Sequence, residues 1–198
     1  MKNQWNDRYG QSEYYYGTEP NTFLVDQVNQ IKKNEKILCL AEGEGRNAVF
    51  LAKNGFQVTA VDSSQVGLDK LAELAQKNNV VIETVCCDLN AFIFESNYWS
   101  GIVSIWCHLP SELRAKVHKG VVSSLKPGGV FILEAYRPEQ LNFKTGGPQN
   151  ADLMPTLSQI VAELPGLKPV MAREIERSIS EGIGHQGMSA VVQFVGTK

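Results

Sequence analysis

A pair of glycines, an aspartate and two histidines are the residues whose types and spacing could do chemistry in this sequence. Gly43 and Gly45 follow a compact apolar run, and Asp62 follows the next such run. Glycines let a ligand approach the backbone, and a carboxylate at this spacing can accept hydrogen bonds from both hydroxyls of a ribose. His108 and His185 are suited to proton transfer near neutral pH. The order strand, loop, helix, strand and acid predicts a cradle for a dinucleotide or nucleoside.

The loop residues bear on which cofactor that is. Residues 43–48, Gly-Glu-Gly-Arg-Asn-Ala, also satisfy the G-x-G-x-x-[GA] pattern, so a nicotinamide cofactor remains an alternative. Glu42 and Glu44 disfavour it, because a pyrophosphate at a helix N-terminus needs positive potential. S-adenosylmethionine has no phosphate, and carboxylates tolerate its sulfonium and ammonium groups. A non-enzymatic regulator that binds the same cofactor is the second alternative.

Apolar runs alternating with amphipathic stretches must position these residues. An amphipathic helix is expected after Asn21, whose side chain can cap it, and another is expected over 113–125. No helix is expected at 90–100, where a single turn suffices. Buried strands separated by helices predict a parallel sheet covered on both faces. The strands are expected at 36–41, 57–61, 80–86, 101–106 and 130–134.

The C-terminal part has a different pattern. Residues 138–155 are polar and predict a long surface loop, and Thr156 with Gln159 matches a capping box that starts a helix. Two final strands, at 168–178 and 188–195, are joined by a short glycine-rich connector and predict an antiparallel pair. The fold class is therefore α/β, a three-layer Rossmann-like arrangement with a mixed seven-stranded sheet whose last strand is antiparallel.

The composition limits the class of protein. The chain has 198 residues, of which 43% are hydrophobic and 20% charged, with a formal net charge of −2. These values are typical of one globular domain and disfavour a nucleic-acid partner bound through a large basic surface. No apolar run is long enough for a membrane span, so we expect a cytoplasmic protein without a membrane partner. The four cysteines lie in apolar stretches and are expected to be reduced and buried: Cys39, Cys86, Cys87 and Cys107.

Four segments resemble, in order, the motifs of class I S-adenosylmethionine-dependent methyltransferases. Residues 41–48 resemble the first motif, 62–64 the acidic motif, 87–89 the adenine-binding motif and 125–131 the turn into the fifth strand. The opening, residues 5–9 and 16–21, is similar to the small tellurite-resistance and thiopurine-type subgroup. The resemblance implies one methyltransferase domain over 1–198. It divides into an N-terminal lid and helix (1–35), a cofactor-binding core (36–135), and a substrate-side loop with a strand pair (136–198).

The resemblance also implies roles for single residues. Gly43 and Gly45 would hold the methionine part of S-adenosylmethionine, with Glu42 facing its amino group. Asp62 would bind the ribose. The adenine would contact Ser63, Asp88 and Leu89, and the remaining cofactor contacts would be Tyr16 and Trp106.

A small-molecule methyl acceptor is expected beyond the carboxyl ends of the later strands. His108, His185 and Tyr136 are the candidate catalytic residues, and Tyr136 is expected mainly to line the pocket. His118 lies in an amphipathic stretch and is expected on the surface, while Arg46 is expected to pair with an acid beside the loop.

Five aromatic residues precede the first strand, and two roles are open for them. Their rings could close over the sulfonium as a lid, or they could dock the N-terminal segment onto the core. They are Trp5, Tyr9, Tyr14, Tyr15 and Tyr16.

Overall fold

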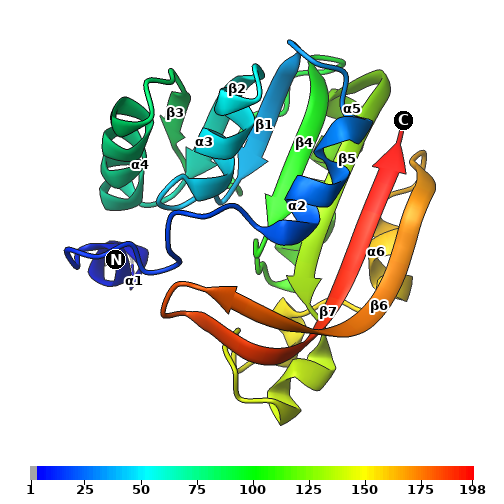
Figure 1. The fold of residues 1–198 in the computed structure, drawn as a ribbon. Coiled ribbons are helices and arrows are strands. Elements are labelled where there is room, and N and C mark those ends of the chain that lie inside the picture. Colours follow the sequence, from blue (N-terminus) through cyan, green and yellow to red (C-terminus); the bar gives the residue numbers. More distant parts are fainter. Residues whose placement is uncertain (1–3) are drawn as a thin grey trace.

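A seven-stranded sheet forms the centre of the molecule (Figure 1). The computed structural model describes residues 4–198. The strands lie in the order β3-β2-β1-β4-β5-β7-β6, and β7 runs antiparallel to both of its neighbours. The predicted mixed sheet is confirmed. The strands are β1 (Lys36–Leu40), β2 (Gln57–Asp62), β3 (Glu83–Cys86), β4 (Trp99–Ile105), β5 (Leu125–Tyr136), β6 (Lys168–Glu181) and β7 (His185–Thr197).

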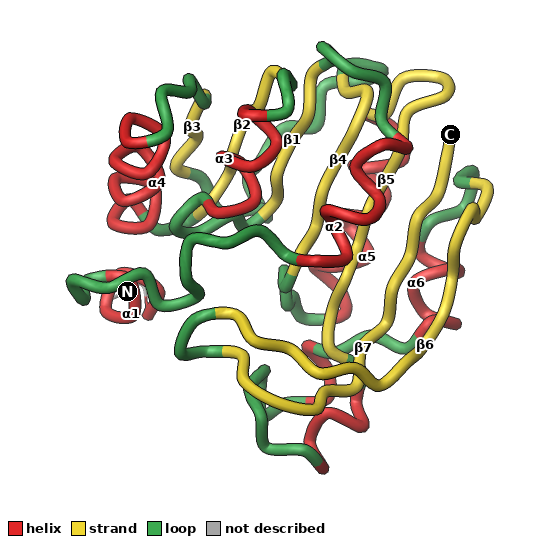
Figure 2. Tube along the Cα trace, viewed as in Figure 1, coloured by secondary structure: helices red, strands yellow, loops and turns green. Residues whose placement is uncertain are grey.

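Helices cover both faces of the sheet, as the alternating pattern predicted (Figure 2). One apolar core joins one face to α2 (Thr22–Gln27), α3 (Arg46–Lys53) and α4 (Gln65–Lys77). A second core joins the other face to α5 (Ser111–Ser124) and α6 (Leu157–Glu163). The remaining helices are short: α1 (Gln4–Tyr9), η1 (Val28–Gln30), η2 (Pro138–Asn142) and η3 (Ala151–Leu153). Within residues 4–198 no helix combines the length and apolarity needed to cross a membrane.

Local signals set several element boundaries. The Asn21 side chain accepts the backbone N–H of Leu24 and caps α2, and the capping box of Thr156 and Gln159 opens α6. Residues 90–100 contain turns and no helix, as expected. The segment 138–155 differs from the prediction, because it contains the short helices η2 and η3 rather than loop alone.

Two expectations about burial are wrong. Cys39 is buried, but Cys86 is exposed and Cys87 and Cys107 are half-buried. The reason for Cys86 is that β3 is an edge strand paired only with β2. His118 is buried rather than on the surface, because α6 covers its side of α5 and Glu163 lies 2.7 Å from its Nδ1.

The tip of the β6–β7 hairpin meets the N-terminal segment at the carboxyl edge of the sheet. Figure 1 shows the hairpin curving below the parallel strands toward α1. The backbone N–H of Ile183 donates to the carbonyl of Tyr15 at 2.7 Å, and Gly182 lies directly against Gly17. Segments from the two ends of the chain therefore enclose the region where β1, β2, β4 and β5 end.

Candidate active site

The loop after β1 turns sharply into α3. Gly45 caps α3 with φ of +94°, a left-handed conformation that favours glycine, and a Cβ there would overlap Leu71. Glu42 folds back so that its Oε1 accepts the N–H of Ala48 at 2.7 Å. Burial raises the pKa of Glu42 to about 7, against the lowering effect of its backbone hydrogen bonds. The predicted turn is confirmed, but Glu42 is engaged with the helix start.

Asp62 at the end of β2 faces this loop. Its Oδ2 accepts the N–H of Gly43 at 2.9 Å, and its Oδ1 accepts the N–H of Ser64 at 2.8 Å. The side chain is only 5% exposed, and burial raises its pKa against these hydrogen bonds. A carboxylate has about four lone-pair positions, and Asp62 also accepts from the backbone N–H of Ser63, so one position is left for a further donor.

The residues expected around an adenine lie at the neighbouring strand ends. In the register of β2 and β3, Asp62 is opposite Cys86, and Asp88 follows two residues later. Asp88 and Ser63 are exposed, whereas Leu89 is buried. The Oδ1 of Asp88 accepts the N–H of Asn90 at 2.8 Å, which fixes the carboxylate at the start of the following turn.

Glu44 and Lys70 hold the N-terminal segment against the loop. Glu44 forms an ion pair with Lys70, and its Oε2 accepts the N–H of Tyr15 at 2.8 Å. The Lys70 ammonium also donates to the carbonyl of Glu13 at 2.6 Å. Tyr9 is 5% exposed, and its ring packs beside Gly43. These contacts dock the segment on the core, and a role as a lid stays a prediction.

Rings from four distant parts of the chain form what we call the aromatic cluster, which comprises Tyr16, Trp106, His108, Tyr136 and His185. Ring centroids are 4.5 Å apart for Trp106 and Tyr136 and 5.5 Å for His108 and Tyr136, the latter pair nearly parallel at 8°. His185 lies 4.9 Å from Trp106 and 4.6 Å from Tyr16. The fold therefore brings the three candidate catalytic residues together.

Both histidines of the cluster are neutral near pH 7. His108 Nδ1 lies 3.2 Å from the carbonyl of Leu153, and burial lowers the pKa of His108 to about 4. His185 Nδ1 lies 3.5 Å from a Glu181 oxygen, yet burial outweighs that partner and lowers the pKa of His185 as well. No group of three or more His, Cys, Asp or Glu side chains in residues 4–198 is arranged to hold a metal ion.

A buried polar network behind the cluster was not predicted from the sequence. Glu181 Oε2 accepts from Trp106 Nε1 at 2.7 Å and from Arg46 Nη2 at 2.5 Å, and its Oε1 accepts from Asn21 at 2.9 Å. Asn21 also donates to Glu134 at 2.7 Å. Arg46 thus pairs with an acid, as predicted, but with one 135 positions away on β6. No local pattern marks such a partner.

Two non-glycine residues with left-handed backbones border the site. Ala41 follows β1 with φ of +50°, and Trp106 follows β4 with φ of +58°. Such conformations cost on the order of 1–3 kcal/mol and persist where the surroundings over-determine them, which is common at functional sites. β1 and β4 are hydrogen-bonded neighbours, so both strained residues lie at one place on the sheet edge.

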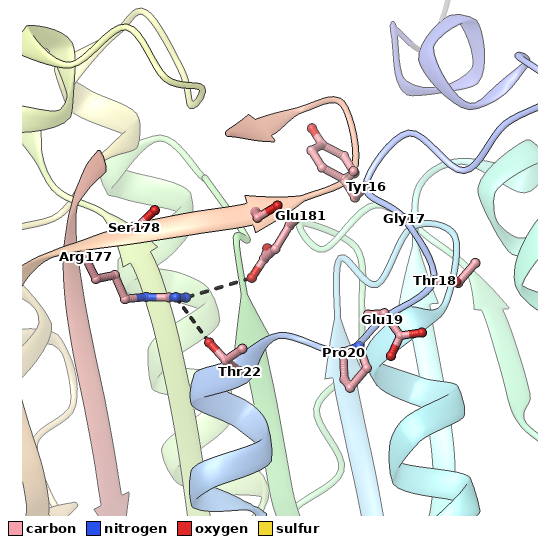
Figure 3. A pocket seen from close by; sticks show the side chains of 11 residues that line it. Tyr16, Gly17, Thr18, Glu19, Pro20, Thr22, Arg177, Ser178 and Glu181 are labelled. Carbon is pink, nitrogen blue, oxygen red and sulfur yellow. Dashed lines mark hydrogen bonds and ion pairs between the residues drawn. The ribbon is translucent and has the colours of Figure 1, made fainter. Parts of the chain in front are cut away.

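A cavity of about 350 Å³ opens beside the cluster (Figure 3). It lies between the N-terminal segment and the end of β6. Two of its lining residues belong to or touch the cluster: Tyr16 is a member, and Glu181 accepts from Trp106. Figure 3 shows the Arg177 guanidinium reaching toward Glu181 and Thr22 across it. Asp62, Asp88 and His108 do not line this cavity.

Comparison with known sequences finds similarity to methyltransferases. A family described as "Methyltransferase domain" matches residues 37–129. The chain is 33% identical over 133 residues to the probable S-adenosyl-L-methionine-dependent methyltransferase TehB of Haemophilus influenzae strain Rd. The match covers 64% of this chain and 46% of that protein, so the chain spans less than half of this relative.

Solved structures share the whole architecture. The crystal structure of TehB from Haemophilus influenzae superposes with a TM-score of 0.75 at 20% identity, covering 98% of this chain and 65% of that one. The Burkholderia thailandensis 1,6-didemethyltoxoflavin-N1-methyltransferase, solved with 1,6-didemethyltoxoflavin and S-adenosylhomocysteine bound, gives a TM-score of 0.64 at 17% identity. That match covers 89% of this chain and 75% of the other.

Proposed function

Because the chain belongs to the class I S-adenosylmethionine-dependent methyltransferases and resembles the tellurite-resistance type, we propose that it methylates a small molecule. The observation that carries the proposal is the position of the aromatic cluster. Two neutral histidines, Trp106 and Tyr136 gather where β4 and β5 end, next to the loop after β1. Ligands of open parallel sheets bind at this edge.

The residues around the loop suit the proposed cofactor. Asp62 retains a lone pair for a ribose hydroxyl, and the exposed Asp88 and Ser63 would reach the adenine. The cations beside the loop are already neutralised, since Arg46 pairs with Glu181 and Lys70 with Glu44. Neither Arg46 nor Lys70 is therefore left unpaired for a pyrophosphate, which supports S-adenosylmethionine over a nicotinamide dinucleotide.

The bound cofactor would supply a methyl group on a positively charged sulfur. The neutral thioether is a good leaving group, so the transfer needs no metal. The protein's contribution is then mainly to position the acceptor and exclude water. Trp106 and Tyr16 offer aromatic faces that stabilise a cation by about 0.5–2 kcal/mol. Arg8 donates to the Tyr16 hydroxyl at 2.8 Å and is exposed, so it could meet the cofactor carboxylate.

The acceptor is proposed to be small because of what surrounds the cluster. The N-terminal segment and the β6–β7 tip enclose this edge of the sheet, which limits the size of an acceptor that can reach the cluster. The Burkholderia relative in fold is named for a small heterocyclic substrate. A net charge of −2 gives no support for a polyanionic acceptor.

Calorimetric titration with S-adenosylmethionine and S-adenosylhomocysteine tests the cofactor part of the proposal. Transfer of a tritiated methyl group to a library of small nucleophiles, with transfer RNA as the comparison, tests the acceptor part. We expect submillimolar cofactor binding and label in the small-molecule fraction. Absence of binding would overturn the proposal as a whole, whereas label found only in RNA would overturn the small acceptor.

A further inference from the structure

One buried nitrogen of the aromatic cluster has no hydrogen-bond partner among residues 4–198. It is Nε2 of His108. The other ring nitrogen, Nδ1, lies 3.2 Å from the carbonyl oxygen of Leu153, which can only accept. Nδ1 must therefore carry the proton, and Nε2 presents a lone pair. A buried acceptor without a donor is destabilising, so this position calls for a ligand that donates a hydrogen bond.

The tautomer of His108 is set by how the fold holds Leu153. Asp152, the preceding residue, accepts the N–H of Ser111 on its Oδ2 at 3.2 Å. Its carbonyl accepts from Arg114 Nη1 at 3.1 Å, and Arg114 is itself bound to Glu163 of α6. The start of α5 thus anchors η3 beside His108, and the Leu153 carbonyl stays directed at Nδ1.

The groups whose rings pack on His108 are uncharged, and of the charged groups behind Leu153, Arg114 is paired with Glu163 and Asp152 accepts from Ser111. The titratable groups that face it are Tyr136 on β5 and His185 on β7, with Cys107 adjacent in the chain. Burial raises the pKa of Tyr136 and Cys107 and lowers that of His185, so all three are neutral near pH 7. Glu181, behind His185, is paired with Arg46.

The remaining arginines near the cluster are also engaged. Arg177 is bound to Glu134 and Arg137 to Glu139. An anionic acceptor at Nε2 would lose its hydration in this buried place, and the cations that could offset the loss are the exposed Arg8, which bonds the Tyr16 hydroxyl, and the cofactor's own sulfonium. An uncharged acceptor would lose much less.

We propose that the acceptor is an uncharged nucleophile bearing a proton, and that His108 Nε2 receives that proton. The inference rests on the proposed function. In the step, a lone pair of the neutral R–XH attacks the methyl carbon, and the sulfur–methyl bond breaks with its electron pair going to sulfur. The X–H bond then gives its proton to Nε2. The products are R–X–CH₃, the neutral thioether and an imidazolium.

His185 is the competing base, and its geometry is less suited. Its Nδ1 is at 3.5 Å from Glu181, an oxygen that already accepts from Arg46 and Trp106 at 2.5 and 2.7 Å. His185 is therefore the most distant of the three groups around that oxygen. Its ring packs on Tyr16 and Trp106, so we assign it a positioning role.

The pH dependence of methyl transfer to 2-mercaptoethanol distinguishes a base from a structural residue. The wild-type rate should be nearly flat between about pH 6 and 8, because the thiol and His108 are both neutral there. His108→Asn keeps an amide that can donate to Leu153 but removes Nε2. Its rate should be lower and rise about tenfold per pH unit with the thiolate fraction. His185→Asn should lower the rate and keep the flat profile.

Three results would overturn the inference while leaving the proposed function intact. The first is a wild-type rate that itself follows the thiolate fraction. The second is methylation of selenite in preference to thiol, phenol and imidazole. The third needs no acceptor. In ¹⁵N NMR of the imidazole, with His108→Asn for assignment, His108 should be the Nδ1–H tautomer at pH 7. An Nε2–H tautomer or an imidazolium would refute the assignment. Failure of cofactor binding, in contrast, would refute the proposed function.

Discussion

The indole of Trp106 and the guanidinium of Arg46 donate to the same oxygen of Glu181. These two hydrogen bonds link Trp106, which follows β4, to Arg46 at the start of α3, through a carboxylate at the end of β6. Trp106 has a left-handed backbone, so its indole reaches Glu181 only because the chain turns sharply at that point. The proposed cofactor side and the proposed acceptor side of the site therefore share one buried anion.

Replacing that anion should destabilise the protein strongly. Glu181→Gln leaves Arg46, which is 6% exposed, without its charged partner, and breaking a buried pair costs about 3–5 kcal/mol. Urea unfolding followed by circular dichroism measures the loss. Glu176→Gln, on the exposed side of the same strand, is the control and should change stability by less than about 1 kcal/mol. Equal effects in the two variants would contradict a special role for Glu181.

The same carboxyl should make stability sensitive to acid. Burial alone would raise the pKa of Glu181, but the hydrogen bond from His185 and the charge of Arg46 lower it to about 2. Because the folded pKa is below the unfolded value of 4.5, its stabilisation is full above pH 4.5 and is lost as pH falls toward 2. We expect the difference in unfolding free energy between wild type and Glu181→Gln to shrink over this range. A difference independent of pH would argue against the pair.

The contact between the hairpin tip and the N-terminal segment can be tested with two glycines. Gly182 and Gly128 both have positive φ, so an alanine at either pays roughly the same backbone cost of 1–2 kcal/mol. A Cβ at Gly182 would collide with the backbone of residues 15–17, whereas one at Gly128 meets no atom within 4 Å. Gly182→Ala should therefore release the segment, and chymotrypsin should cleave after Tyr14–Tyr16 faster than in Gly128→Ala. Equal cleavage rates would show that the hairpin does not hold the segment.

Asp62 should dominate the binding of the ribose. Asp62→Ala should weaken S-adenosylhomocysteine binding by about 1.5–3 kcal/mol, or roughly 10- to 150-fold, the scale for losing charge-assisted hydrogen bonds. Calorimetry on the purified variant measures this. Asp69→Ala, an exposed position on α4 that bonds Gln65, is the matched control and should leave the dissociation constant unchanged. An unaltered constant in Asp62→Ala would place the ribose elsewhere.

Short-range patterns in the sequence were sufficient for the sheet, the turn at Gly43 and Gly45, the caps at Asn21 and Thr156, and the acid after β2. Each depends on residues within a few positions of one another, where hydrophobic period and turn chemistry act directly. The motif order also predicted the methyltransferase family. The local hydrophobic pattern misjudged Cys86 and His118, because burial depends on which element covers a surface.

Tertiary structure alone decided how the acceptor side is built. Glu181, Glu134 and Asn21 come from β6, β5 and the N-terminal segment, and Leu153 reaches His108 across 45 positions. Nothing in the local sequence encodes such pairs, since they arise from strand order and from the reach of a long hairpin. The sequence by itself determined that a cofactor-type loop and two histidines exist, and the packing of distant segments determined which nitrogen is left with a free lone pair.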